Sequence, residues 1–274
     1  VVHIGSPKGA SRLAQRIGQQ VEIDLNDAAR KDLFDFIEAE KLDCDFQLTG
    51  RFTGAMRPEI FETMKREADM LNRHLGLEPK LVERNNQHDE IGSDLYHGGI
   101  VREDIGGIHP GKLHRELRRV AEAAGTKIHS GTGVTGIKRI GGTFNVTTPK
   151  GTIKANHVIV CTNGYTDKGL PWLRRRLVPV ISEMIATEPL SQNLMKTLMP
   201  KQQMHGETRQ LGHYYRPSPD GTRILLGGRR YDDDAAKARE RLRGGLLEIF
   251  PDLSETKLSH HWFGFVAFPM DELP

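Results

Sequence analysis

Four segments of the chain carry apolar residues at intervals of three and four, the spacing of one helix face. The clearest of them begins at Pro58, a favoured first position of a helix, and stops at Gly76. A second runs over residues 110–125, again with proline first and glycine last, and Leu113, Leu117 and Val120 are among the residues expected to face inward. The other two cover about 26–41 and 235–250. We therefore expect four amphipathic helices, separated by segments of a different pattern.

Strict alternation of apolar and polar residues, typical of half-buried strands, appears after the helix at 110–125. Residues 143–148 alternate around Phe144 and Val146, and residues 151–155 are placed to pair back with them. Short strands are also expected at 127–130 and 133–139. Together these segments predict a small antiparallel sheet inserted within one continuous region of the chain.

The next segment, residues 156–165, ends in an apolar run at Val158-Ile159-Val160-Cys161. A continuous run of this length predicts a buried parallel strand. The run stops at Thr162-Asn163-Gly164, where small residues allow a ligand to approach the backbone, as at the carboxyl edge of open α/β sheets. Cys161 has no cationic neighbour to lower its pKa, so we interpret it as a small buried hydrophobe rather than a nucleophile.

Beyond Tyr165 the strand-like segments become more frequent and only the helix at 235–250 interrupts them. This pattern predicts a mostly antiparallel sheet, separate from the first unit; its strands are expected at 177–187, 211–216, 222–227 and 257–268. Nearer the start of the chain, residues 45–56 are expected to form an extended hairpin punctuated by Gly50 and Gly54.

Composition and charge argue against a nucleic-acid or membrane partner. Thirty-nine basic and 36 acidic residues in 274 give a net charge of +3, too little to indicate a nucleic-acid partner. No apolar run approaches the roughly 20 residues of a membrane helix, and no signal peptide is visible, so we expect no membrane partner.

Two cysteines, far apart in the sequence, favour a reduced, cytoplasmic protein. Because the chain starts at Val1 and stops just after the apolar stretch 262–268, we expect missing sequence on both sides.

The histidines do not suggest a metal centre. Those at positions 205, 213, 260 and 261 lack the spacing of metal ligands, and no HExxH or His-x-His pattern occurs among them. We therefore predict no structural or catalytic metal.

A set of short motifs recurs in one order through most of residues 95–274. They are His109-Pro110, Ala123-Ala-Gly125, Gly133-Val-Thr-Gly-Ile137, Val146-Thr-Thr148, Gly151, Cys161-Thr-Asn-Gly-Tyr165, Leu177-Val-Pro-Val180, Ile185-Ala-Thr-Glu-Pro-Leu190, Tyr215-Arg216, Pro219-Asp-Gly221, Leu226-Gly-Gly-Arg229, Trp262-Phe-Gly264 and Asp271-Glu-Leu-Pro274. In this order they resemble the FAD-dependent D-amino-acid oxidase-like family, and most of all its γ-glutamylputrescine oxidase branch. Two glycine-rich segments of the family, the GxGxxG turn and the one after the Asp-x-x-Pro motif, have no counterpart here.

The resemblance implies an α/β (α+β) fold with two parts, a Rossmann-like FAD-binding domain and a mixed, mostly antiparallel substrate domain. Residues 95–165 would belong to the FAD-binding domain and residues 166–268 to the substrate domain. Residues 1–94, helical and hairpin-like, would complete the substrate domain, and residues 269–274 would begin the return to the FAD domain.

The resemblance also implies FAD as cofactor and assigns residues to it. The backbone of Val134 would contact the adenine edge, although a strand valine can equally belong to the core. Thr162, Asn163 and Gly164 would pass close to the phosphate or ribose of the cofactor; the alternative is a plain turn.

The substrate implied is a small amine or amino acid that loses a hydride to the flavin. Tyr215 and Arg216 fall near the family's substrate tyrosine and offer a phenol and a guanidinium for an amine or carboxylate. Strand alternation allows only one of the two to face the pocket. Trp262 would form a wall of that pocket, or else belong to the core.

Two rival functions remain open. A flavin-free binding or assembly subunit would keep the fold without catalysis. A flavoenzyme of the same fold would instead act on a 2-hydroxy acid or a modified tRNA base.

Overall fold

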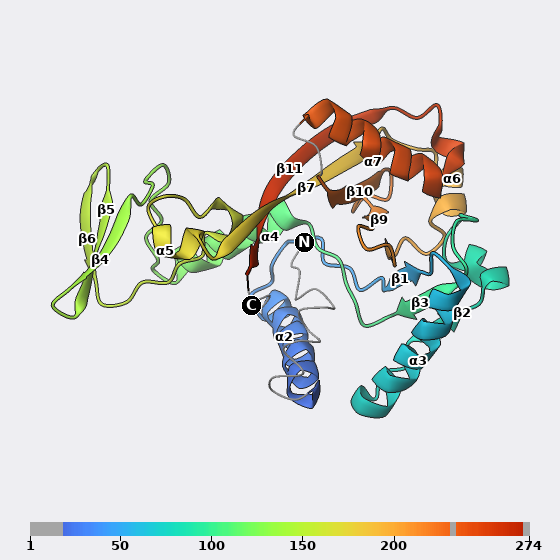
Figure 1. Ribbon diagram of the computed structural model, residues 1–274, viewed down its shortest axis with the longest axis horizontal. Helices are drawn as coiled ribbons and strands as arrows, with labels where there is room; N and C mark the ends of the chain where they lie inside the picture. Colours follow the sequence, from blue (N-terminus) through green and yellow to red (C-terminus); the bar gives the residue numbers. More distant parts are fainter. Residues whose placement is uncertain (1–18, 231–233, 271–274) are drawn as a thin grey trace.

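The computed structural model describes residues 19–230 and 234–270 (Figure 1). Its largest element is an eight-stranded mixed sheet in which every neighbouring pair is antiparallel except β1 and β8, which are parallel. In order across the sheet the strands are β11 (Leu258–Pro269), β7 (Leu177–Thr187), β10 (Ile224–Arg229), β9 (Tyr214–Pro217), β8 (Met204–Glu207), β1 (Arg51–Gly54), β3 (Gly99–Arg102) and β2 (Lys80–Val82).

The four strands expected after Tyr165 are all present and neighbour one another in this sheet, so the antiparallel pattern is confirmed. The expected hairpin at 45–56 is wrong. Its strand β1 pairs with β3 on one side and β8 on the other, and so joins segments far apart in sequence. The same sheet contains β3, although residues 95–165 were expected in the other unit.

The small antiparallel sheet is confirmed; it is separate from the large sheet and projects to one side of the molecule (Figure 1). It consists of β4 (Gly136–Ile140), β5 (Thr143–Thr148) and β6 (Gly151–Ala155). Residues 127–130, expected to form a strand, have no strand geometry.

The helices are α2 (Gln19–Ala39), α3 (Pro58–Leu75), α4 (Pro110–Ala123), α5 (Pro171–Arg174), α6 (Gln192–Leu198) and α7 (Ala235–Ile249), with 3-10 turns η1 (Arg84–Asp89), η2 (Asn163–Tyr165) and η3 (Pro251–Leu253). The predicted caps are confirmed for α3, where Gly76 adopts φ 60° and its N–H donates to the carbonyl of Asn72. Helix α7 continues through its glycine pair because Gly245 packs against the ring of His213, where a Cβ would lie 2.5 Å from Cε1.

The main core lies between the large sheet and the helices α6 and α7, which cover one of its faces (Figure 1). Its largest fully buried side chains include Phe52, Tyr96, Leu226, Leu246 and Phe250. They come from β1, β10, α7 and its C-cap Phe250, and from the segment before β3, so the core needs elements from both ends of the chain.

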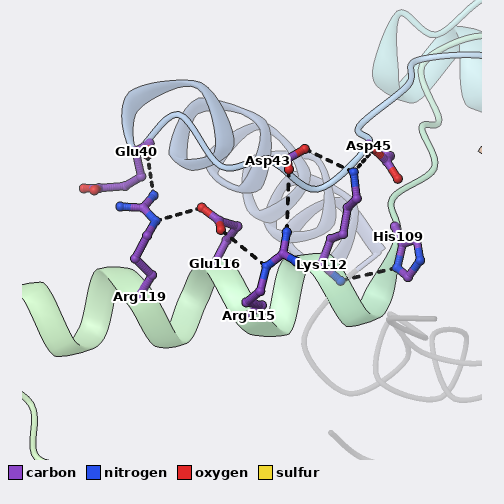
Figure 2. Close-up of polar contacts among 8 residues, drawn as sticks. All are labelled: Glu40, Asp43, Asp45, His109, Lys112, Arg115, Glu116 and Arg119. Carbon is purple, nitrogen blue, oxygen red and sulfur yellow. Dashed lines mark hydrogen bonds and ion pairs between the residues drawn. The ribbon is translucent and has the colours of Figure 1, made fainter.

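Helix α4 is attached to the segment after α2 by ion pairs and apolar packing. Figure 2 shows Lys112 reaching Asp45, with Nζ 2.6 Å from Oδ1, and Arg119 reaching Glu40, with Nη2 donating to its backbone carbonyl at 3.3 Å. Its face toward Cys44 carries Leu113 and Val120, as predicted. Leu117, expected on the same face, is 42% exposed, and Glu116 is buried in its place.

The apolar run at residues 158–161 differs most from expectation. It has no strand geometry, Ile159 is 88% exposed, and the thiol of Cys161 is accessible. The buried parallel strand is therefore wrong, and so is the core position of Cys161. Within the described residues no strand lies alongside this run, so its backbone has no ladder to join and its side chains have no layer to cover them.

Candidate functional site on the distal face of the large sheet

The large sheet has two unlike faces, and β9 shows which residues lie on each. Tyr215 is 2% exposed in the core against α7, with its Oη 2.8 Å from the Oη of Tyr96. Because side chains alternate along a strand, Tyr214 and Arg216 lie on the opposite face, where both are half-buried. We call that side, turned away from α6 and α7, the distal face. The expected position of Tyr215 in a substrate pocket is wrong; Arg216 lies on the distal face.

A row of paired residues crosses the distal face from β11 to β8. Trp262 pairs with Met184, Met184 with Gly227, Gly227 with Tyr214, and Tyr214 with Gly206. The two glycines let large neighbours lie flat on the sheet. A Cβ at Gly227 would lie 2.8 Å from Cζ of Tyr214 and closer still to Sδ of Met184. The row therefore combines aromatic, thioether and bare backbone surface on one face.

Tyr214 is held in place at its hydroxyl. Its Oη forms a short hydrogen bond with Oγ of Ser182 on β7. Burial raises the pKa of Tyr214, and the Ser182 contact offsets only part of that increase. The phenol is therefore neutral over the physiological range and presents its ring and hydroxyl in a defined orientation.

Arg216 is fixed by backbone oxygens rather than by carboxylates. Its Nη1 donates to the carbonyl of Ile108 at 3.0 Å and its Nε to the carbonyl of Pro217 at 3.2 Å. A Cβ at Gly107 would lie 2.7 Å from Nη1, so this glycine makes room for the guanidinium. Burial lowers the pKa of Arg216, but an arginine remains charged at any physiological pH. It contributes a fixed positive charge to the distal face.

Trp262 lies at the β11 end of the row and is 43% exposed. A core position for Trp262 is therefore excluded, and the ring is available to form a wall. Sequence reasoning missed Tyr214 and Met184, which accompany it on the distal face. The signal that could have revealed them was strand alternation together with Gly227, because a glycine within a strand leaves room for large neighbouring side chains on the same face.

The residues expected near the cofactor form a turn docked on β11. Oδ1 of Asn163 accepts from the backbone N–H of Ala267 at 2.7 Å, and Asn163 itself has φ 46°. A Cβ at Gly164 would lie 2.6 Å from the carbonyl carbon of Phe265. The ring of Tyr165 packs edge-on against that of Phe265, with centroids 5.4 Å apart. In this structure Asn163 and Gly164 hold the edge strand, and the small size of Gly164 is explained by that contact.

Thr162 and Val134 differ from their neighbours in being accessible. Among the described residues, Oγ1 of Thr162 bonds only the hydroxyl of Thr166, at 2.7 Å, and Val134 is 41% exposed. Both can therefore contact a ligand without rearrangement of the fold. The side chain of Asn163 cannot do so without releasing β11.

These residues fit FAD only in part. A dinucleotide needs backbone N–H groups at a helix N-terminus for its pyrophosphate, usually in a glycine-rich turn after a strand. Among residues 19–230 and 234–270, the connection from β3 to α4 contains the pair Gly106–Gly107, but it lacks the GxGxxG spacing and α4 begins with Pro110, which has no backbone N–H to donate. The described residues supply an accessible surface for the cofactor without its phosphate cradle.

Within the described residues, no three His, Cys, Asp or Glu side chains are grouped so as to hold a metal ion. No helix there is long and apolar enough to cross a membrane.

The chain resembles known proteins in both sequence and structure. It is 28% identical over 255 residues to a probable oxidoreductase, OrdL, of Rhizobium meliloti (strain 1021), covering 92% of this chain and 58% of the relative. It is 30% identical over 240 residues to the gamma-glutamylputrescine oxidoreductase of Escherichia coli (strain K12), covering 87% of this chain and 56% of the relative. The chain thus spans a little over half the length of these curated relatives.

Solved structures share the fold at lower sequence identity. Glycine oxidase from Geobacillus kaustophilus superposes with a TM-score of 0.74 at 18% identity, covering 92% of this chain and 67% of that chain. L-proline dehydrogenase from P. horikoshii gives a TM-score of 0.73 at 18% identity, with the same coverage. At such identity the likeness shows the fold alone.

The family match extends over nearly the whole chain. Residues 4–274 match the family described as DAO, FAD dependent oxidoreductase. This range includes the distal face of the large sheet, the small sheet and the turn at Asn163–Tyr165. The chain belongs to the DAO family of FAD-dependent oxidoreductases.

Proposed function

We propose that the whole protein binds FAD and oxidises an amine or amino acid by transferring a hydride from the substrate carbon to the flavin. The observation that carries this proposal is the distal face, which combines an accessible aromatic wall, an oriented phenol and a fixed guanidinium within one domain of a flavoprotein family. The flavin supplies the acceptor for the hydride, so the protein has to bind and orient the substrate rather than supply a strong acid.

Each residue has a distinct part in this proposal. Trp262 forms an apolar wall against the carbon chain of the substrate, and Tyr214 orients it through a hydroxyl already fixed by Ser182. Arg216 contributes positive charge. On the cofactor side we propose Val134 and Thr162 as contacts with FAD, and Asn163 and Gly164 as the turn that positions them.

Substrate class, domain division and location are part of the same proposal. The relative named gamma-glutamylputrescine oxidoreductase favours an amine of that kind, with a chain between the reacting carbon and a polar end. Residues 95–165 are proposed to contribute to the FAD domain and residues 166–268 to the substrate domain. The two unpaired thiols, Cys44 and Cys161, support a cytoplasmic location.

Anaerobic titration of the purified full-length protein tests the function. We expect a bound flavin whose visible absorbance bleaches with at least one amine or amino acid. A folded, colourless protein would support the flavin-free binding subunit. Bleaching by 2-hydroxy acids but by no amine, or a flavoprotein that modifies tRNA alone, would support the second rival.

A further inference from the structure

A small cavity lies on the side of the large sheet opposite the distal face, between β10 and the first turns of α7. Its volume is about 100 Å³, well below the roughly 300 Å³ at which pockets for whole organic ligands begin. Gly228 lines it from the sheet, and Ala238 and Leu242 of α7 form the apolar part of its wall. The cavity therefore accepts one small group, and it is separate from the surface on which we place the reaction.

The ring of His213 lines this cavity and is held in one orientation. Two glycines make space for it, because a Cβ at Gly245 would lie 2.5 Å from its Cε1 and Nε2, and one at Gly228 would lie 3.5 Å from its Cδ2. Its Nδ1 lies 3.1 Å from Oε1 of Glu207, and the same oxygen accepts from the backbone N–H of His213 at 2.8 Å. Among the described residues Nε2 has no hydrogen-bond partner, so it is the ring nitrogen left for a ligand.

Glu207 determines what this nitrogen can do. Burial raises the pKa of Glu207, but hydrogen bonds from the ring and the backbone of His213 outweigh that effect and hold the pKa below the ordinary 4.5. The carboxylate is therefore ionised at neutral pH and can only accept, which makes Nδ1 the donor. Nε2 of the neutral ring then has a lone pair for a proton carried by a ligand.

Positively charged side chains surround the same cavity. Lys237 and Arg241 lie four residues apart on one side of α7, and Arg230 follows the end of β10. Within the described part of the chain, the ammonium of Lys237 forms neither a hydrogen bond nor an ion pair. Arg230 is engaged by Glu183, with Nη1 3.3 Å from Oε1, and adds charge from the sheet. Because no carboxylate occurs among the described residues that line the cavity, its interior attracts an anion.

Helix α7 offers side chains rather than backbone groups to this cavity. Oδ1 of its N-cap, Asp234, accepts from the backbone N–H groups of Ala236 and Lys237, at 2.8 and 3.4 Å. These donors of the first turn are therefore occupied. A ligand has to be bound by the ammonium, the guanidinium groups and the imidazole.

We infer that this cavity binds a phosphate group, of free phosphate or of a phosphomonoester. Ionised phosphate oxygens match Lys237 and Arg241, for which lysine acts as a point charge and arginine as a planar donor. The second proton of a phosphate ester has a pKa of about 6, so near neutral pH it is readily shared with the imidazole of His213. A carboxylate, with a pKa of about 4, has no proton to share. The site is independent of the proposed reaction.

Calorimetric titration of the full-length protein, near neutral pH and at constant ionic strength, tests the site with inorganic phosphate, glycerol 3-phosphate and malonate. We expect wild type to bind one phosphate per chain, and malonate at least about tenfold more weakly. Lys237→Gln should weaken phosphate binding at least about tenfold, because a charge-assisted hydrogen bond is lost. Arg239→Gln is the matched control: it removes the same charge from a part of α7 that lines a different hollow, and should change binding less than about twofold.

A second variant examines the proton. His213→Asn keeps a donor toward Glu207 and removes Nε2, so the ratio of phosphate to malonate affinity should fall to within about twofold of one. The melting temperature of each variant reports whether it is folded. Retention of the wild-type ratio in folded His213→Asn would contradict the part given to Nε2.

The two phosphate probes distinguish the source of the ligand. Tighter binding of glycerol 3-phosphate identifies an organic phosphate, whereas equal or weaker binding identifies free phosphate. Absence of saturable binding, malonate binding as tight as that of phosphate, or equal effects of Lys237→Gln and Arg239→Gln would overturn the inference. Because binding is measured without turnover, a failure to oxidise amines would refute the proposed reaction and leave this site unaffected.

Discussion

The backbone of Gly227 lies directly beneath the ring of Tyr214, so that a Cβ at Gly227 would come 2.8 Å from Cζ of the ring. The two residues are a register pair between β10 and β9, and the ring is tethered at its far end to Ser182. Tyr214 therefore has little freedom to move aside. The shape of the distal face depends on the missing side chain at Gly227.

Replacing Gly227 with alanine should destabilise the protein by about 1–3 kcal/mol, because the added methyl forces Tyr214 and Met184 away from the sheet. Chemical unfolding of the 274-residue chain measures the effect. The matched control is Gly244→Ala in α7, where a Cβ meets nothing within 4 Å. There we expect a gain of roughly 0.5–1 kcal/mol from helix propensity. Equal effects at the two glycines would contradict the packing described for the distal face.

Tyr215→Phe should affect stability and not substrate binding. The variant loses the hydroxyl pair between Tyr215 and Tyr96, worth about 1 kcal/mol, while Tyr96 keeps Glu207 as a partner. In the full-length enzyme its kcat/KM should stay within about twofold of wild type, since the side chain faces the core. Tyr214→Phe is the comparison and should change KM. A KM effect confined to Tyr215→Phe would restore the pocket position expected from the sequence.

His205 should make the protein less stable in mild acid. Burial lowers the pKa of His205 from its ordinary 6.5 to about 3, outweighing the attraction of Glu90, and neither ring nitrogen has a hydrogen-bond partner within the described residues. The unfolded chain therefore binds a proton that the folded chain rejects. The stabilising contribution of neutral His205 is fully present above pH 6.5 and declines as the pH falls toward 3.

The corresponding measurement is the free energy of unfolding between about pH 5 and 6.5, where we expect His205 to contribute roughly 1.5 kcal/mol of change. His205→Phe should remove this contribution and raise stability at the acidic end, because a ring of similar shape keeps the stacking on Tyr215 without unpaired nitrogens. Glu207 and Glu90, whose pKa values lie below the ordinary 4.5, act at lower pH and serve as an internal reference. An unchanged pH slope in His205→Phe would exclude His205 as the source.

The two thiols should differ in reactivity in the 274-residue chain. Cys161 is exposed and should react with a thiol reagent such as DTNB within the native state. Cys44 is 1% exposed, and burial raises its pKa, so it should react only on unfolding. Cys161→Ser should abolish the fast phase and Cys44→Ser the slow one. Native protection of Cys161 would show that the run before it is covered after all.

Local patterns were enough to predict the elements whose stability is local. Pro58 and Gly76 bound α3 as expected, because their backbone preferences act within a few residues. The meander of β4, β5 and β6 was predictable for the same reason, since short turns join strands that alternate on their own. Strands β7, β9, β10 and β11 of the large sheet were predicted individually, whereas β2 and β8 were not, and β1 was given the wrong partner.

The sequence by itself determined that this chain is an α/β member of the DAO family and that Tyr215 and Arg216 point to opposite sides of a strand. Only the tertiary structure decided which side faces α7, so that Tyr215 became core and Tyr214 and Arg216 came to lie on the distal face. It also decided that the run ending at Cys161 is exposed. The physical reason is common to both cases: alternation and hydrophobicity are properties of one segment, whereas burial depends on which other segment packs against it.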